Sequence, residues 1–462
     1  MTQAIRSGIQ RFRPYFLLFV LLSVVYHSNL RPVAAGDSFP GSLIPFSLLL
    51  DGSLTLDRFA PWMEEHFAYS SRVVRKAGGH WYSWYPIAGP VLAAPLYLPV
   101  AVVPWTRHQS PGTLISLARI LEKVTAVTLA AASAVVLLCL LRRFTSARAA
   151  WLLTLVFALG TGNWSTSSQA LWPHTFDQLA ILGCLYSIER FGAFAPPTRW
   201  YWIAGLCAAC AFAIRLTNLM LLPALALALW LRPTRPLDYV RAFAPSLAAA
   251  ALIAAYNFAV FGNLAGGYSA QPGARFFDAL PGILISPARG LLIYTPIALF
   301  ALCAFLPRAC PLRFQHRPLL AGAGAFALLH ILAIAAWPNW WGGYCWGPRL
   351  LTEILPCLIV LMALGWPAIG GGNLKWIFAA AAFYCFFIQA LGVYCYPKGH
   401  WDSSPLSVDV DPGRLWNWGD NPIVRTFHGG VAWEPYSIVA AAATGGLPAA
   451  AQKLRQFGLN PY

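Results

Sequence analysis

One carboxylate of this 462-residue chain stands where an acid could accept a proton, at the edge of an apolar run. Asp37 lies in Gly36–Asp37–Ser38, shortly after the first apolar segment. A carboxylate partly withdrawn from water can act as a general base, and its oxygens can also bind a divalent cation. The alternative is structural, because Asp is a common N-cap of a following helix. The residue types leave both roles open.

Three arginines could bind an anion close to a membrane surface. Each stands beside an apolar run on the face that the charge pattern predicts to be outside: Arg215, Arg289 and Arg349. A planar guanidinium can bind two phosphate oxygens at once. Arg215 could instead snorkel or pair with Glu353 or Asp177. Arg349 could pair with Glu353, four residues later on one helical face.

Aromatic and polar side chains near these charges could line a substrate groove. The strings HWYSWYP (residues 80–86) and WPNWWGGYCWGPR (residues 337–349) adjoin apolar runs. Such rings either anchor the chain at the membrane interface or form a wall for a sugar ring or an isoprenoid chain. His174 and Asp177, three residues apart, are expected to pair at a helix start. The candidate groove residues are His80, Trp84, Tyr85, His174, Tyr344 and Glu353.

The composition indicates a membrane protein. The sequence is 58% hydrophobic and 10% charged, with a mean hydropathy of +0.58, whereas soluble domains carry about 25% charged residues. The formal net charge of +16 fits basic cytoplasmic loops and does not require a nucleic-acid partner. The sequence contains no nucleotide-binding loop, hydrolase elbow or zinc-protease motif. No predicted cytoplasmic loop is long enough to form a domain for a soluble nucleotide-sugar donor.

Eleven apolar runs predict an all-α polytopic membrane protein with about 11 transmembrane helices. The runs are residues 14–30, 118–141, 149–164, 174–192, 200–214, 217–231, 242–261, 290–306, 318–337, 350–366 and 375–396. The run 88–105 contains repeated prolines, so we expect it to be re-entrant or to lie at the interface. The short basic loops then share one face, which predicts the N-terminus inside and the C-terminus outside.

This topology predicts a transmembrane catalytic module at 1–396 and a short extracytoplasmic tail at 397–462. The first outer loop, 31–117, is expected to contain interfacial helices. The first apolar run follows several arginines and has the features of a retained signal anchor. Cys345 and Cys395 fall at predicted outer ends of spans and could form a disulfide in an oxidising compartment.

Five strings occur in a characteristic order within about residues 14–396. They are GDSFPGSLIPFSLLLDGSLTLDRF, HWYSWYPIAGPVLAAPLYLP, SSQALWPHTFD, PARGLLIYTP and WPNWWGGYCWGPRLLTEILP. With the predicted layout, they resemble the GT-C superfamily of integral-membrane glycosyltransferases. The strings are most similar to its bacterial branch related to protein mannosyltransferases and the lipid A aminoarabinose transferase (glycosyltransferase family 39-like).

The resemblance implies sugar transfer from a polyprenyl-phosphate donor to a glycolipid, glycan or protein on the outer face of the inner membrane. It implies that Asp37 acts on the acceptor or organises a metal. Relatives often have Lys where this chain has Trp84, so Arg215, Arg289 or Arg349 is expected to bind the donor phosphate. Because Ser38 replaces a second acid, Mg²⁺ or Mn²⁺ near Asp37 is left open as a cofactor, and no metal ligands are assigned.

A non-enzymatic transporter or flippase of a phosphorylated lipid or an envelope polysaccharide is the alternative. It would use the same arginines to bind a phosphate headgroup without forming a glycosidic bond. The sequence shows no internal repeat, which argues against a transporter built from inverted halves. The expected partners of the enzyme are the lipid-linked donor, the bilayer and an extracytoplasmic acceptor.

Overall fold

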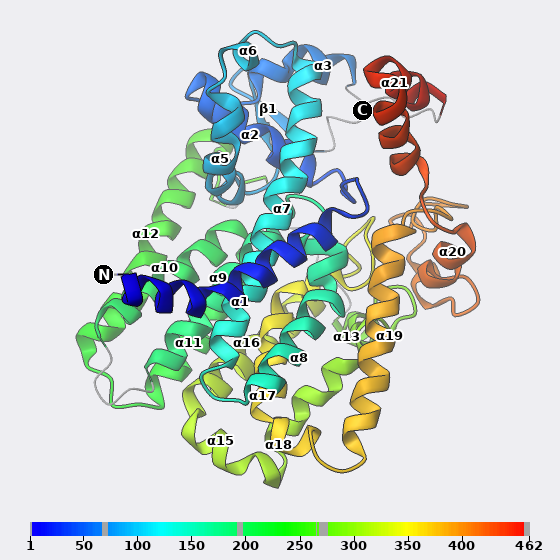
Figure 1. Ribbon diagram of the computed structural model, residues 1–462. Helices are drawn as coiled ribbons and strands as arrows, with labels where there is room; N and C mark the ends of the chain where they lie inside the picture. Colours follow the sequence, from blue (N-terminus) through cyan, green and yellow to red (C-terminus); the bar gives the residue numbers. More distant parts are fainter. Residues whose placement is uncertain (1, 67–72, 192–196, 265, 268–275, 457–462) are drawn as a thin grey trace.

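The computed structural model describes residues 2–66, 73–191, 197–264, 266–267 and 276–456, and helices dominate it (Figure 1). Residues 67–72 of the predicted first outer loop lie outside the described residues. The first loop contains α2 (Ser38–Asp51), η1 (Asp57–Phe59), α3 (Ala60–Glu65), β1 (Val74–Ala77), β2 (His80–Ser83), α5 (Ala88–Ala101) and α6 (Pro104–Arg107).

The remaining elements form the bundle and the tail. They are α1 (Thr2–His27), α7 (Pro111–Leu141), α8 (Ala147–Leu159), η2 (Asn163–Ser167), α9 (Pro173–Arg190), α10 (Arg199–Ile214), η3 (Leu216–Met220), α11 (Leu221–Trp230), α12 (Pro236–Phe261), α13 (Phe276–Ile285), α14 (Leu291–Tyr294), η4 (Pro296–Phe305), η5 (Pro307–Ala309), α15 (Cys310–Gln315), α16 (Arg317–Ala335), η6 (Arg349–Ile354), α17 (Leu355–Leu364), α18 (Trp366–Ile369), α19 (Leu374–Tyr394), η7 (Pro412–Trp416), α20 (Pro422–Gly429) and α21 (Glu434–Gln456).

Helical backbone covers most of each of the eleven predicted apolar runs. Four described helices, α7, α12, α16 and α19, are long and apolar enough to cross a membrane by length and composition. Others are shorter, and some runs are divided between two helical types, such as η6 followed by α17. The all-α architecture is therefore confirmed, whereas the number and direction of the crossings stay predictions.

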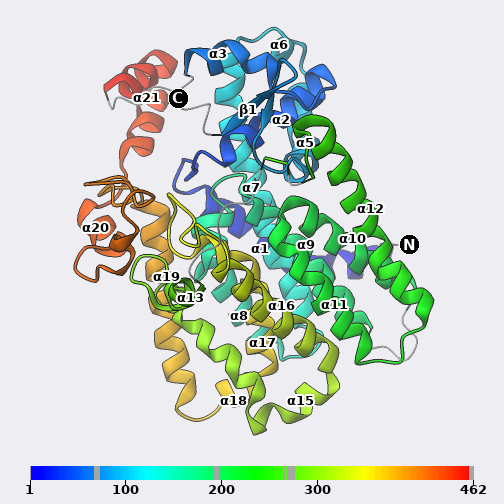
Figure 2. The same ribbon diagram turned by 180° about the vertical axis from the view of Figure 1, so that it is seen from behind.

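The first-loop elements gather at one end of the molecule, and α15 and α18 lie at the other (Figures 1 and 2). Helix α5 continues through Pro95 and Pro99 and packs mainly against α2. Helix α7 begins in this layer and runs toward the opposite end (Figure 1). Its 31 residues correspond to about 46 Å of helix. The first loop is thus a folded layer that is joined to the bundle by α7.

A two-stranded antiparallel hairpin stands in this layer. Its register pairs Val74 with Ser83 and Ala77 with His80. The connecting Gly78 and Gly79 both have positive φ angles, 55° and 88°, which a two-residue hairpin turn of this hand requires. The described residues contain no other sheet.

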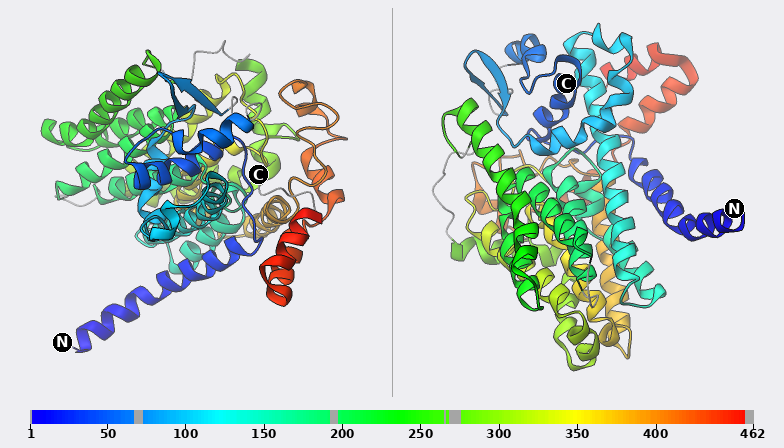
Figure 3. Two further views of the ribbon diagram at one scale, coloured as in Figure 1. Left: turned by 90° about the horizontal axis from the view of Figure 1, so that it is seen from above. Right: turned by 90° about the vertical axis from the view of Figure 1, so that its left-hand side faces the viewer.

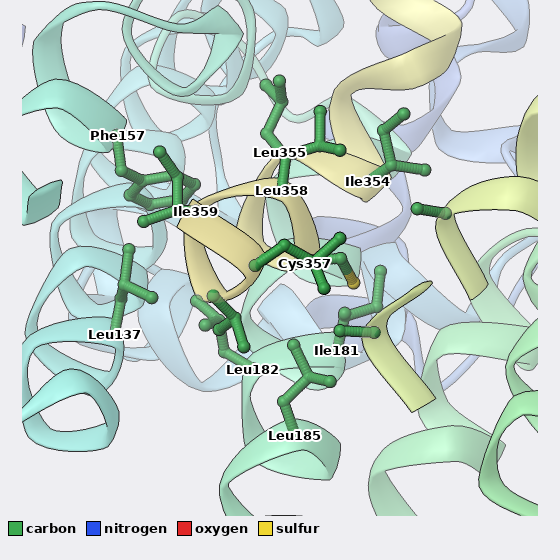
Figure 4. Close-up of a cluster of buried hydrophobic side chains, with 14 of the residues drawn as sticks. Leu137, Phe157, Ile181, Leu182, Leu185, Ile354, Leu355, Cys357, Leu358 and Ile359 are labelled. Atoms are coloured by element: carbon green, nitrogen blue, oxygen red, sulfur yellow. The ribbon is translucent and has the colours of Figure 1, made fainter. Parts of the chain in front are cut away.

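Helix α17 lies at the centre of the apolar core. All ten of its side chains are buried. Figure 4 shows Leu355, Leu358 and Ile359 among side chains from three neighbouring helices: Leu137 of α7, Phe157 of α8, and Ile181, Leu182 and Leu185 of α9. A helix enclosed on every side has no polar face to retain, which explains its sequence LPCLIVLMAL.

The two ends of the chain lie at the periphery of the bundle. Figure 3 shows α1 leaving the bundle toward its N-terminus, and Figure 1 shows α21 on the side of the first-loop layer. Cys345 and Cys395 are both buried as free thiols, so the structure does not contain the disulfide that their predicted positions allowed.

Candidate active site

Asp37 forms an ion pair with an arginine from the other end of the sequence. It occupies the N-cap position of α2, but its side chain makes no capping hydrogen bond. Its Oδ2 instead accepts a hydrogen bond from Arg349 Nη1 at 2.6 Å. Its Oδ1 is buried and has no hydrogen-bond partner among the described residues. A buried oxygen that is left unpaired beside an ion pair is a site where a ligand hydroxyl can bind.

Arg349 is oriented from three sides. Nη1 binds Asp37, Nη2 donates to the carbonyl of Gly342 at 2.8 Å, and Cζ lies 4.3 Å from the ring centroid of Trp172. Gly342 has a φ of 74°, a left-handed conformation that only glycine adopts at little cost. The side chain of Arg349 is 10% exposed. Its Nε is buried and also lacks a partner among the described residues.

Glu353 is the centre of a second buried charge cluster. Its Oε1 accepts a hydrogen bond from Arg215 Nη1 at 2.5 Å and lies 2.8 Å from His174 Nδ1. His330 Nε2 is 3.8 Å from Oε2. Glu353 is fully buried, whereas the side chain of Arg215 is 15% exposed. The predicted alternative that Arg215 pairs with Glu353 is confirmed.

Two predicted local pairs do not form. Arg349 and Glu353 lie on η6, a 3-10 helix, in which three residues complete a turn. Residues four positions apart on this helix therefore face different directions. Arg349 and Glu353 each contact side chains that are far away in the sequence. His174 likewise contacts Glu353, 179 residues away, and not Asp177. Both predictions assumed α-helical neighbours and were wrong because tertiary partners lie closer.

Arg289 is almost completely buried in a structural contact set. Its Nη2 donates to Asp402 Oδ1 at 2.5 Å and to the carbonyl of Gly343 at 2.9 Å. Its Nε donates to the carbonyl of Trp341 at 3.0 Å, and its side chain is 1% exposed. Tyr396 donates its hydroxyl proton to the other oxygen of Asp402. Arg289 therefore supports the loop that precedes Arg349.

The remaining predicted groove residues lie farther out. His80 is exposed on the hairpin and lies 2.6 Å from Asp57 Oδ2. The guanidinium carbon of Arg75 lies 5.9 Å from the ring centroid of Trp84. Tyr344 is 41% exposed, and its hydroxyl lies 3.0 Å from that of Ser407. Tyr85 is half-buried and lies within electrostatic reach of Arg349.

Sequence reasoning missed Glu122 and Lys123, which lie next to this site. Both are buried in α7, within the predicted transmembrane run 118–141. The signal was present, because an ionisable residue inside a predicted span is a candidate functional residue by default. Trp172 was also missed, since nothing local shows that its ring faces an arginine.

The described residues do not bring three or more His, Cys, Asp or Glu side chains together in a group able to hold a metal. Asp37 Oδ2 lies against the guanidinium of Arg349. A small cavity of about 10 Å³ lies between η2, α14 and η6, and Arg349 is among the residues that line it. Such a volume admits about one water molecule, so it is not a substrate site.

Comparison with known proteins identifies the fold. No protein-family model and no curated protein matches the sequence. The crystal structure of ArnT from Cupriavidus metallidurans bound to undecaprenyl phosphate matches with a TM-score of 0.53 at 13% identity, covering 94% of this chain and 80% of that chain. The crystal structure of the Archaeoglobus fulgidus oligosaccharyltransferase, tethered with an acceptor peptide by a disulfide bond, gives 0.48 at 11% identity, covering 99% and 60%.

The second match is too weak to support an argument, and the first concerns the fold alone. ArnT is aligned along nearly the whole chain, so the likeness includes both the first-loop layer and the helical bundle. The chain therefore has the fold of ArnT.

Proposed function

We propose that this protein transfers a sugar from a polyprenyl-phosphate-linked donor to an acceptor on the extracytoplasmic face of the inner membrane. The observation that carries the proposal is the contact between Asp37 and Arg349, at 2.6 Å, in a chain with the fold of ArnT. A candidate base and a candidate phosphate-binding cation are thereby adjacent, as a transfer reaction requires. ArnT, which shares the fold, was crystallised with undecaprenyl phosphate.

Asp37 accepts the proton of the acceptor hydroxyl through its unpaired Oδ1. The acceptor oxygen forms a bond to the anomeric carbon of the sugar, from the face opposite the phosphate. The bond between that carbon and the phosphate oxygen breaks, and its electron pair leaves with the polyprenyl phosphate. One displacement inverts the anomeric configuration.

Arg349 stabilises the charge that develops on the leaving phosphate, an electrostatic contribution that is often the largest in such reactions. In the free protein this arginine is neutralised by Asp37. An incoming phosphate competes for the same guanidinium, so donor binding frees Asp37 Oδ2 as well. Donor binding thus prepares the base before the acceptor reacts.

Arg215 is the second cation that we assign to the donor. It is partly exposed, and Glu353 and His174 fix its position from the buried side. We assign Arg289 a supporting role, because its donors are engaged by Asp402 and loop carbonyls. Tyr85 and Trp84 line the acceptor side, and no step of the reaction is assigned to a metal.

The membrane orientation belongs to the same proposal. With eleven crossings and the N-terminus inside, the first-loop layer and residues 397–462 lie outside. The donor's isoprenoid chain then reaches the site from the bilayer beside α5. This arrangement joins a lipid-borne donor to an acceptor in the aqueous space.

A deletion strain tests the proposal. Mass spectrometry of envelope glycolipids, glycans and glycoproteins should show one sugar-bearing species that disappears in the deletion strain and returns with the wild-type gene. Purified protein in vesicles should form the same glycosidic bond from a polyprenyl-phosphate sugar. Translocation of a lipid-linked saccharide without any new bond would instead establish the transporter.

A further inference from the structure

Two adjacent residues of α7 carry opposite charges into the interior. Glu122 is fully buried and Lys123 is 6% exposed. Arg119 Nη1 lies 2.7 Å from Glu122 Oε2 and partly neutralises it. Charges in an apolar bundle are costly and are retained where they act on something. The contacts of this pair indicate what they act on.

Both side chains hold the segment between η2 and α9. Lys123 Nζ donates to the carbonyl of Ser168 at 3.1 Å and to Oε1 of Gln169 at 2.8 Å. Glu122 Oε1 accepts the backbone N–H of Leu171 at 3.1 Å. One charged residue thus holds the start of the segment and its neighbour holds the end. The position of the segment is set by α7.

The next residue in that segment is Trp172, whose ring lies against Arg349. The guanidinium carbon is 4.3 Å from the ring centroid, well inside the range of a cation–π contact. Arg349 binds Asp37, and Ser38, the following residue, lies within hydrogen-bonding reach of Glu122. The contacts therefore form a closed ring that runs from Glu122 through Leu171, Trp172 and Arg349 to the start of α2.

We infer that Glu122 and Lys123 are positioning residues, which fix Trp172 and through it the plane of the Arg349 guanidinium that receives the donor phosphate. This inference rests on the proposed function. A planar guanidinium binds two phosphate oxygens only in one orientation, and an indole ring 4.3 Å from its central carbon restricts how the guanidinium can turn. A residue that only stabilised the bundle would affect unfolding and leave phosphate affinity unchanged.

Binding of undecaprenyl phosphate to the full-length protein in lipid nanodiscs tests the inference without knowledge of the sugar. Glu122→Gln loses the charge that pairs with Arg119 and weakens the hydrogen bond from the Leu171 N–H, because an amide oxygen is a poorer acceptor than a carboxylate. We expect its Kd to rise about tenfold, with thermal unfolding near that of the wild type. Trp172→Leu should give the same loss and serves if Glu122→Gln does not fold.

A matched control and a double-mutant cycle identify the cause. Glu189 is a second buried acid, paired with Arg143 and His316, and Glu189→Gln should bind like the wild type. Arg349→Lys keeps the charge but loses the planar fork, and its Kd should also rise. Adding Glu122→Gln to Arg349→Lys should cause little further loss, because both changes remove one arrangement.

Three results would overturn the inference. Wild-type affinity in both Glu122→Gln and Trp172→Leu would remove the positioning role while leaving the donor site at Arg349 intact. Losses that multiply in the double mutant would show that Glu122 acts independently of Arg349. Wild-type affinity in Arg349→Lys would remove the phosphate role of Arg349 itself, and with it the proposed donor site.

Discussion

Arg349 and Asp37 are 312 positions apart in the sequence, and their side chains meet at 2.6 Å. The carboxylate stands at a helix N-cap without capping the helix, and the arginine opens a 3-10 helix without pairing within it. Asp37 thus does not cap α2, and Arg349 does not pair with Glu353 on its own helix. Such a pair brings a proton acceptor and a phosphate-binding cation to one place.

Asp37→Asn should lower sugar transfer by about 10²–10⁴-fold, the usual contribution of a general base. The amide cannot accept the acceptor's proton, although it keeps the shape of the side chain. Mass spectrometry of the envelope in the complemented deletion strain measures the loss, and immunoblotting of membranes checks insertion. Asp51→Asn is the control, because Asp51 pairs with Arg58 at the surface of the same loop. If Asp37→Asn protein inserts into the membrane and transfers sugar at the wild-type rate, Asp37 is not the general base.

Arg289→Met should destabilise the protein by about 3–5 kcal/mol, since it leaves Asp402 buried without its cation. Asp402→Leu in the same chain should recover part of that loss, because no lone charge then stays buried. Thermal unfolding of the purified protein in detergent measures both variants. A double variant less stable than Arg289→Met would contradict the buried ion pair as the cause.

Glu353→Gln should reduce both stability and transfer. Arg215 and His174 would lose their shared carboxylate in a buried position, at a cost of about 3–5 kcal/mol. Glu64→Gln is the comparison, because the side chain of Glu64 is 60% exposed and 3.8 Å from Lys76, and such pairs contribute little. Unfolding in detergent and envelope analysis in cells give the two measurements. Equal behaviour of the two variants would argue against the Glu353 cluster.

The hairpin of the first loop should lose order in acid. Burial raises the pKa of Asp57, but hydrogen bonds from the Trp81 N–H and from His80 and Thr55 outweigh it, so the pKa lies below its usual value. The stabilising contribution is therefore present above about pH 4 and is lost as pH falls through the folded-state pKa. The effect is small, because the side chain of Asp57 is 38% exposed.

Hydrogen exchange of the Trp81 amide, which donates to Asp57 Oδ1 at 2.8 Å, measures this loss. Protection, corrected for intrinsic exchange, should fall between pH 5 and pH 3 in the wild type. Asp57→Asn should show lower protection at pH 5 and no further drop. A wild-type amide equally protected at both pH values would show that the ionised carboxylate does not order the hairpin.

The predictable part of this protein follows from properties that act locally. Apolar runs must satisfy their backbone hydrogen bonds internally when water is scarce, so the eleven runs predicted the helical segments without tertiary information. Asp37, Arg215 and Arg349 stand at the ends of these runs on the predicted outer face, and this position also marked them as candidates. Nothing in the periodicity of the runs showed that Arg289 differs from Arg215 and Arg349 in its role. Only the structure shows that Arg289 is as buried as a core residue.

Tertiary structure alone decided which charges meet. The pairs Asp37–Arg349 and Arg215–Glu353 join segments far apart in the chain, and the geometry of η6 turns Glu353 away from Arg349. The local interpretation failed because spacing specifies neighbours only when the helix type is known. By itself the sequence determined a helical membrane protein with an acid and several arginines at the edges of its apolar runs. The packing of α7, the segment ending at Trp172 and η6 determined which of them face one another.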